Sequence, residues 1–79
     1  MGWHERIERR PEVLGGKPVI RGTRIAVELI LERLGDGWTE QQLLEAWPHL
    51  APEDIRAAQA YAASALSSDE IVFLGRKGS

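Results

Sequence analysis

The clearest hydrophobic pattern in the chain lies between residues 26 and 35. Apolar side chains recur there at i, i+3, i+4 and i+7, the spacing that places them on one face of a helix. Gly37 follows at a position where it can end that helix. We therefore predict a first helix over residues 26–35, whose core-facing side chains are Val27, Ile30, Leu31 and Leu34.

A second helix is predicted from the signal at its start. Thr39 is followed three residues later by Gln42, the capping-box pattern in which each side chain bonds the backbone N–H of the other residue. Trp38 and Leu43 have the spacing of a hydrophobic staple around this cap, so Trp38 is expected to pack against the core. The helix should run to about Trp47, because the proline that follows cannot extend it.

A third helix is predicted over residues 52–66. Pro52 suits the first helical position, and two acidic residues follow it in the first turn, where the helix dipole favours negative charge. Ala51 is a poor cap, since Ser, Thr or Asp would be expected there. The side chains predicted to face the core are Ile55, Ala58, Ala62 and Leu66, and those predicted to face outward are Glu53, Arg56, Ala57, Ala60 and Ser64.

The segment before these helices reads as short extended pieces broken by turns. In GGKPVIRGTR, residues 15–24, three glycines and a proline interrupt a short apolar run. This pattern predicts a hairpin with strands at 19–20 and 23–25 and a separate turn at the glycine pair. A P-loop does not fit, because prolines occupy the positions of its first glycine and of its serine or threonine.

Length and composition indicate one small soluble domain. The chain has 79 residues and no cysteine, so its core is small and no disulfide supplements it. No metal or other cofactor is expected, since the two histidines are isolated from other candidate ligands. No stretch approaches a membrane span, and a reducing cytoplasm suits a chain without cysteine. A homodimer or a partner protein is a reasonable source of further stability.

Positive charge is concentrated at the N-terminus, although the net charge is −2. Residues 1–25 carry six basic and three acidic side chains, whereas residues 26–79 carry four basic and nine acidic ones. Any contact with phosphate is therefore expected mainly from the N-terminal third. The basic side chains of the hairpin could equally form a solvated face.

Four motifs together resemble the family known as domain of unknown function 433. They are GKPVIRGTRI, the GW before the second helix, the PHL turn and the AYA in the third helix, and the similarity covers about residues 16–63. The resemblance implies a mainly α fold, a three-helix, homeodomain-like helix-turn-helix bundle. It also implies an antitoxin of a toxin–antitoxin system, resembling VapB-type antitoxins, with a PIN-like ribonuclease as partner. Ala51 departs from the family, which commonly has threonine there.

Under this interpretation residues 1–66 form the DNA-binding domain, and the third helix is the recognition helix. Its outward face offers few base-reading side chains, so it could instead serve helix packing, for example across a dimer. The hairpin is then the more natural DNA contact, with the arginine pair before it binding the phosphate backbone. The candidate DNA-binding residues are Arg9, Arg10, Lys17, Arg21, Thr23, Arg24, Arg56 and Gln59.

The tail, residues 67–79, contains a short apolar run of high β propensity, made of Ile71, Val72, Phe73 and Leu74. The run could fold back on its own domain or on a second subunit, or it could dock on a toxin as an added strand. We expect a cytoplasmic antitoxin without catalytic activity that neutralises a PIN-like toxin and represses its own operon. The alternative is a protein-interaction module that masks a partner without binding DNA.

Overall fold

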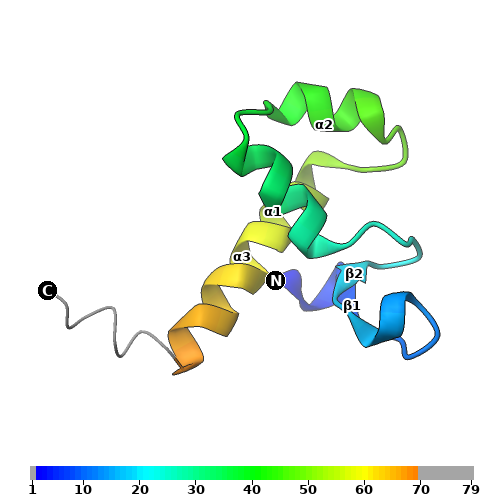
Figure 1. Cartoon of the computed structure of the whole chain (residues 1–79), viewed down its shortest axis with the longest axis vertical. Coiled ribbons are helices and arrows are strands. Elements are labelled where there is room, and N and C mark those ends of the chain that lie inside the picture. Colours follow the sequence, from blue (N-terminus) through cyan, green and yellow to red (C-terminus); the bar gives the residue numbers. More distant parts are fainter. Residues whose placement is uncertain (1, 70–79) are drawn as a thin grey trace, which may run out of the picture.

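The computed structural model describes residues 2–69 and is mainly helical. Figure 1 shows three helices packed around a common centre, with a small two-stranded sheet and the N-terminal segment beside them. The longest helix, α3, extends past the other elements at its C-terminal end. In chain order the elements are η1 (Trp3–Glu5), β1 (Ile7–Glu8), η2 (Leu14–Gly16), β2 (Val19–Ile20), α1 (Val27–Gly35), α2 (Glu40–Ala46) and α3 (Pro52–Asp69).

The three predicted helices are present, and none of their ends shifts by more than three residues. The capping box of α2 is formed as predicted, since Gln42 N donates to Thr39 Oγ1 (3.1 Å) and Thr39 N donates to Gln42 Oε1 (2.8 Å). Helix α3 continues three residues beyond the predicted end at Leu66. The capping box and the hydrophobic spacing, which are local in the sequence, therefore predicted the positions of the helices correctly.

The predicted pairing of the strands is wrong. β2 pairs antiparallel with β1, with Ile7 opposite Ile20 and Glu8 opposite Val19, whereas residues 23–25 form no strand. The expected turn at the glycine pair is present, because both glycines adopt positive φ. The sheet therefore joins the N-terminal segment to the basic loop rather than closing a local hairpin.

A hydroxyl group explains why residues 23–25 do not extend as a strand. Thr23 Oγ1 donates to Ile20 O (2.8 Å) and accepts from Ile25 N (2.9 Å). These two bonds close a tight turn and occupy a backbone amide that a regular ladder would use. The predicted pairing survives only as the hydrogen bond from Ile20 N to Ile25 O (3.0 Å) and the isolated bridge between Val19 and Ala26.

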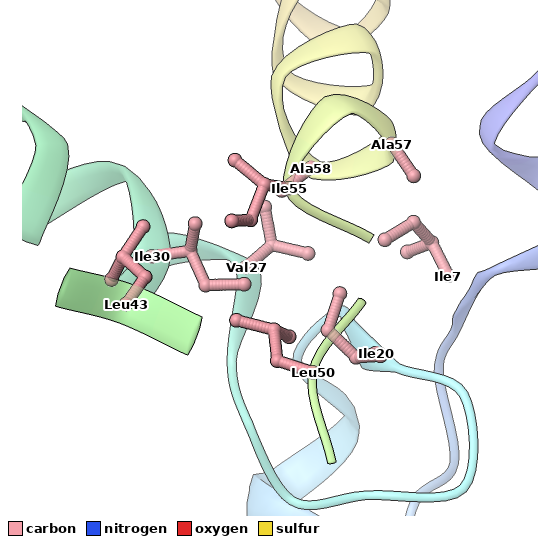
Figure 2. Packing of buried hydrophobic residues seen from close by; sticks show 9 residues of the cluster. All are labelled: Ile7, Ile20, Val27, Ile30, Leu43, Leu50, Ile55, Ala57 and Ala58. Carbon is pink, nitrogen blue, oxygen red and sulfur yellow. The ribbon is translucent and has the colours of Figure 1, made fainter. Parts of the chain in front are cut away.

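The core is one cluster that draws on every helix and both strands. Figure 2 shows Ile30 and Leu43 at the α1–α2 contact and Ile7 pointing toward α3. Because each element contributes only one to three side chains, no element can bury its apolar face without the others. The cluster comprises Ile7, Ile20, Val27, Ile30, Leu43, Leu50, Ile55, Ala57 and Ala58.

The structure corrects the predicted orientation of two side chains on α3. Ala57 was expected to face outward but is only 6% exposed, because the N-terminal segment packs on that face and Ile7 joins the same cluster. Leu66 was expected to face the core but is 63% exposed, because α3 has passed the end of the bundle at this point. Ile55 and Ala58 are buried as predicted.

Asp54 supplies the cap that Ala51 lacks. Its Oδ2 accepts a hydrogen bond from Ala51 N (2.9 Å), and its Oδ1 accepts one from Arg6 Nη1 (3.0 Å). The residue is buried, with 6% of its surface exposed. A carboxylate three positions after the cap can satisfy the capping amide from inside the helix. Asp54 therefore ties the start of α3 to the N-terminal segment.

Candidate functional site

Two of the candidate DNA-binding cations have partners within the domain. Arg9 Nε donates to Gly16 O (2.9 Å), and Lys17 Nζ lies 2.9 Å from Glu28 Oε2. The Lys17–Glu28 pair is well exposed on both sides, so it is held only weakly. A phosphate would therefore compete with Glu28 at Lys17 Nζ, whereas at Arg9 only Nε is engaged and the Nη groups make no ion pair or hydrogen bond within residues 2–69.

Glu8 is the centre of a second group of internal contacts. Its Oε2 accepts a hydrogen bond from Gly22 N (2.9 Å) and lies 3.4 Å from Arg10 Nε, although the Arg10 contact lacks hydrogen-bond geometry. Its Oε1 lies 3.4 Å from Arg21 Nη1. One carboxylate thus contacts two of the arginines that were expected to contact DNA and offsets one of their two charges.

Arg21 acts as a clamp on the N-terminal segment. Its Nε donates to Glu5 O (2.9 Å) and its Nη2 to His4 O (3.0 Å). The clamped segment continues onto α3, where the Trp3 and Tyr61 rings meet edge to face with centroids 4.8 Å apart. Arg21 is therefore placed to hold the fold together, as Thr23 does in the adjoining turn.

Arg24 and Arg56 differ from the other cations. Both are exposed, and neither side chain has an ion pair or a hydrogen bond to another residue within the described range 2–69. The neighbours of Arg24 on both sides are held by the Thr23 turn and by the core, which leaves the arginine side chain to solvent. Gln59 is exposed one helical turn after Arg56.

A cavity of about 360 Å³ lies between the N-terminal segment and α3. Arg6 and Arg56 face it together with two glutamates, so its charges are balanced, and Arg6 is already paired with Asp54. This balance does not favour a strongly anionic ligand. Its lining residues are Gly2, Trp3, Glu5, Arg6, Glu53, Arg56, Ala57 and Ala60.

Neither a cluster of metal ligands nor a membrane-spanning helix occurs within residues 2–69. No three side chains of the kinds that bind metals come together there. Within the same residues, none of the helices combines the length and apolar character of a membrane span.

Comparison with known proteins places the domain in a family. The family model described as "Protein of unknown function (DUF433)" matches residues 7–62, which run from β1 into the second half of α3. The chain belongs to this family. The DUF433 match includes every element of the core cluster, and it includes Arg24, Arg56 and Gln59.

Two other proteins are similar to this chain over most of its length. The uncharacterized protein y4eO of Sinorhizobium fredii (strain NBRC 101917 / NGR234) is 43% identical over 58 residues, which are 73% of this chain and 26% of y4eO. A crystal structure of a DUF433 member protein from Anabaena variabilis ATCC 29413 has a TM-score of 0.72 at 36% identity, covering 75% of this chain and 58% of that one. The chain therefore spans about a quarter of y4eO.

Proposed function

We propose that this DUF433 protein is an antitoxin-type regulator that binds its own operator DNA and holds a PIN-like ribonuclease. The observation that carries the DNA-binding part is the pair of exposed, unpartnered arginines, Arg24 and Arg56. A cation without an internal partner can bind a phosphate, and so release counterions, without first breaking a bond inside the protein. The proposed role is one of binding, with no catalytic step assigned to any residue.

The arrangement of α2 and α3 supports a helix-turn-helix interpretation. Residues 47–51 connect the two helices, and α3 would enter the major groove with its N-terminal half. Arg56 and Gln59 are exposed there, and these residue types read guanine and adenine. Asp54, an acid that would repel phosphate at this end, is instead buried and paired with Arg6.

Alanine variants test the assignment of the DNA contacts. Arg24→Ala and Arg56→Ala should each weaken operator binding and reduce the slope of log K against log[salt] by about 1 for each bound copy of the chain. Lys17→Ala is the comparison variant, since its pairing with Glu28 should make its contribution to the slope smaller than that of Arg24 or Arg56. Fluorescence anisotropy on labelled upstream DNA measures both quantities. Equal slopes for all three variants would contradict the assignment.

A second candidate is a module that masks a partner protein without touching DNA. The internal contacts of Arg9, Arg10, Lys17 and Arg21 favour it, because they leave few cations for a nucleic acid. Both candidates keep the ribonuclease partner. One result distinguishes them: a purified protein that binds a co-expressed PIN-like toxin but shows no preference for its own upstream DNA supports the masking module.

The ribonuclease contact is assigned to residues 71–74, which lie outside the described residues. Removal of residues 70–79 should abolish co-purification with the toxin and preserve the helical circular dichroism, because every side chain of the core cluster lies between Ile7 and Ala58. A variant with residues 71–74 changed to serine is the length-matched control and should behave alike. Retention of the toxin by both variants would contradict this assignment.

A further inference from the structure

The outward side of α3 carries an acidic side chain beside the cation that is proposed to contact DNA. Glu53 and Arg56 are both exposed and line the same cavity, and their separation of three positions places them on one side of the helix. The N-terminal segment packs on the neighbouring Ala57 side and leaves this side open. A molecule that binds the outward side of α3 therefore meets a carboxylate next to an arginine.

The two acids in the first turn of α3 differ in their contacts. Asp54 is buried and accepts hydrogen bonds from Ala51 N and Arg6 Nη1. The Glu53 side chain, in contrast, has no hydrogen bond or ion pair within residues 2–69. An acid in the first turn also stabilises a helix through the dipole, but this effect needs no particular contact. The Glu53 carboxylate is therefore available to accept hydrogen bonds from a ligand.

A carboxylate in the major groove of DNA binds only where a base offers a hydrogen-bond donor. Ionised glutamate is an acceptor only, and the donors in this groove are the amino groups at cytosine N4 and adenine N6. The adenine amino group lies beside N7, an acceptor that repels a carboxylate, whereas the cytosine amino group lies beside a C–H group. Cytosine is therefore the base that suits Glu53.

Helix geometry brings Glu53 and Arg56 to neighbouring base pairs. Three residues of an α-helix advance about 4.5 Å along its axis, and successive base pairs of DNA are about 3.4 Å apart. We propose that Glu53 accepts a hydrogen bond from N4 of a cytosine, one base pair away from the guanine that Arg56 contacts. This role depends on the proposed DNA-binding function and adds to it the base that Glu53 specifies.

A carboxylate at this position increases the specificity of binding rather than its strength. Phosphates repel Glu53 on every DNA sequence, and only a correctly placed cytosine compensates with a hydrogen bond. Glu53→Ala should therefore raise the affinity for unrelated DNA and lower the ratio of specific to unspecific binding by about 5- to 150-fold. Arg56→Ala, in contrast, should weaken binding to both kinds of DNA. Fluorescence anisotropy with operator and unrelated DNA measures both affinities.

Selection from a pool of randomised DNA, followed by sequencing of the bound molecules, tests which base Glu53 reads. The wild type should enrich a C·G pair next to the G·C pair whose preference is lost in Arg56→Ala. Glu53→Gln should change the preferred base at this one position from cytosine to adenine, because glutamine pairs with adenine N6 and N7. Glu32→Gln is the matched control, since it removes the same charge from an exposed acid on α1 and should leave every base preference unchanged. Circular dichroism checks the fold of each variant.

Two results would overturn the proposal, and they differ in what they leave of the proposed function. If the wild type and Glu53→Gln enrich the same sequence, Glu53 contacts no base, while DNA binding through Arg24 and Arg56 stands. A lowered urea midpoint for Glu53→Gln would then assign the carboxylate to helix stability alone. If the wild type enriches no sequence at all, the proposed DNA-binding function fails together with the role of Glu53.

Discussion

Replacing Ile30 by alanine should lower the free energy of unfolding by about 2–5 kcal/mol. The side chain has no exposed surface and lies where α1 meets α2, beside Leu43 in the core cluster. A domain of this size has only about 4–12 kcal/mol of total stability. The loss therefore amounts to a large share of the whole, and a substantial fraction of the variant should be unfolded at 37 °C.

Urea unfolding followed by circular dichroism measures this effect. Leu66→Ala is the matched control, since it deletes a similar volume from a side chain that is 63% exposed, and at low protein concentration it should cost well under about 1 kcal/mol. Similar shifts in the urea midpoint for the two variants would mean that Ile30 is not at the centre of the core.

Asp54→Ala should have the second largest effect, about 1–3 kcal/mol. The substitution removes the acceptor for Ala51 N and leaves Arg6 without its carboxylate. The upper part of this range requires a fully desolvated pair, and the Arg6 side chain is 43% exposed, so water can partly replace the lost partner. The N-terminal segment should detach from α3 more readily than in the wild type.

A neighbouring acid and a double-mutant cycle isolate the two contributions of Asp54. Glu53→Ala removes an exposed carboxylate from the same helical turn and should change stability by less than about 0.5 kcal/mol. In an Arg6→Ala background, Asp54→Ala should retain only the capping contribution of about 1 kcal/mol. If Asp54→Ala and Glu53→Ala cost the same, neither the cap nor the ion pair stabilises the domain.

The helices could be predicted because their signals are local. The Thr39–Gln42 capping box and the apolar spacing of α1 lie within a few residues, and both are confirmed. Trp38 was expected to pack on the core and does so, but only in part: it is half-buried, and its ring stacks with that of Trp47 at 6.4 Å between centroids. The largest packing effect therefore belongs to Ile30 rather than to Trp38.

The contacts of the N-terminal segment could not be predicted, because they join residues far apart in the sequence. Arg6 and Asp54 are separated by 48 positions, and β1 pairs with a strand eleven or more residues away. The sequence contained a hint in Trp3, a large aromatic residue in a polar segment, which packs against Tyr61. Only the folded arrangement reveals that this segment covers the Ala57 face of α3.

In the candidate site, too, local features could be predicted from the sequence, whereas contacts between distant residues could not. Residue type and charge identified the basic loop, but they could not tell which cations have partners inside the domain. Arg21 bonds two backbone carbonyls, whereas Arg24, three positions later in the same loop, has no partner among the described residues. The distinction depends on the path of the N-terminal segment, which no local pattern encodes.

The central claim, that the domain binds its own operator, is tested most directly with the unmodified protein and DNA from its own upstream region. Binding is measured by fluorescence anisotropy at several salt concentrations, with unrelated DNA as competitor. Arg24 and Arg56, the candidate cations whose side chains have no partner among residues 2–69, should together contribute about −2 to the slope of log K against log[salt] for each bound copy of the chain. Two bound copies therefore predict a preference for the upstream DNA and a slope of about −4. The absence of any preference at low salt would contradict DNA binding and leave the partner-masking module as the function of the domain.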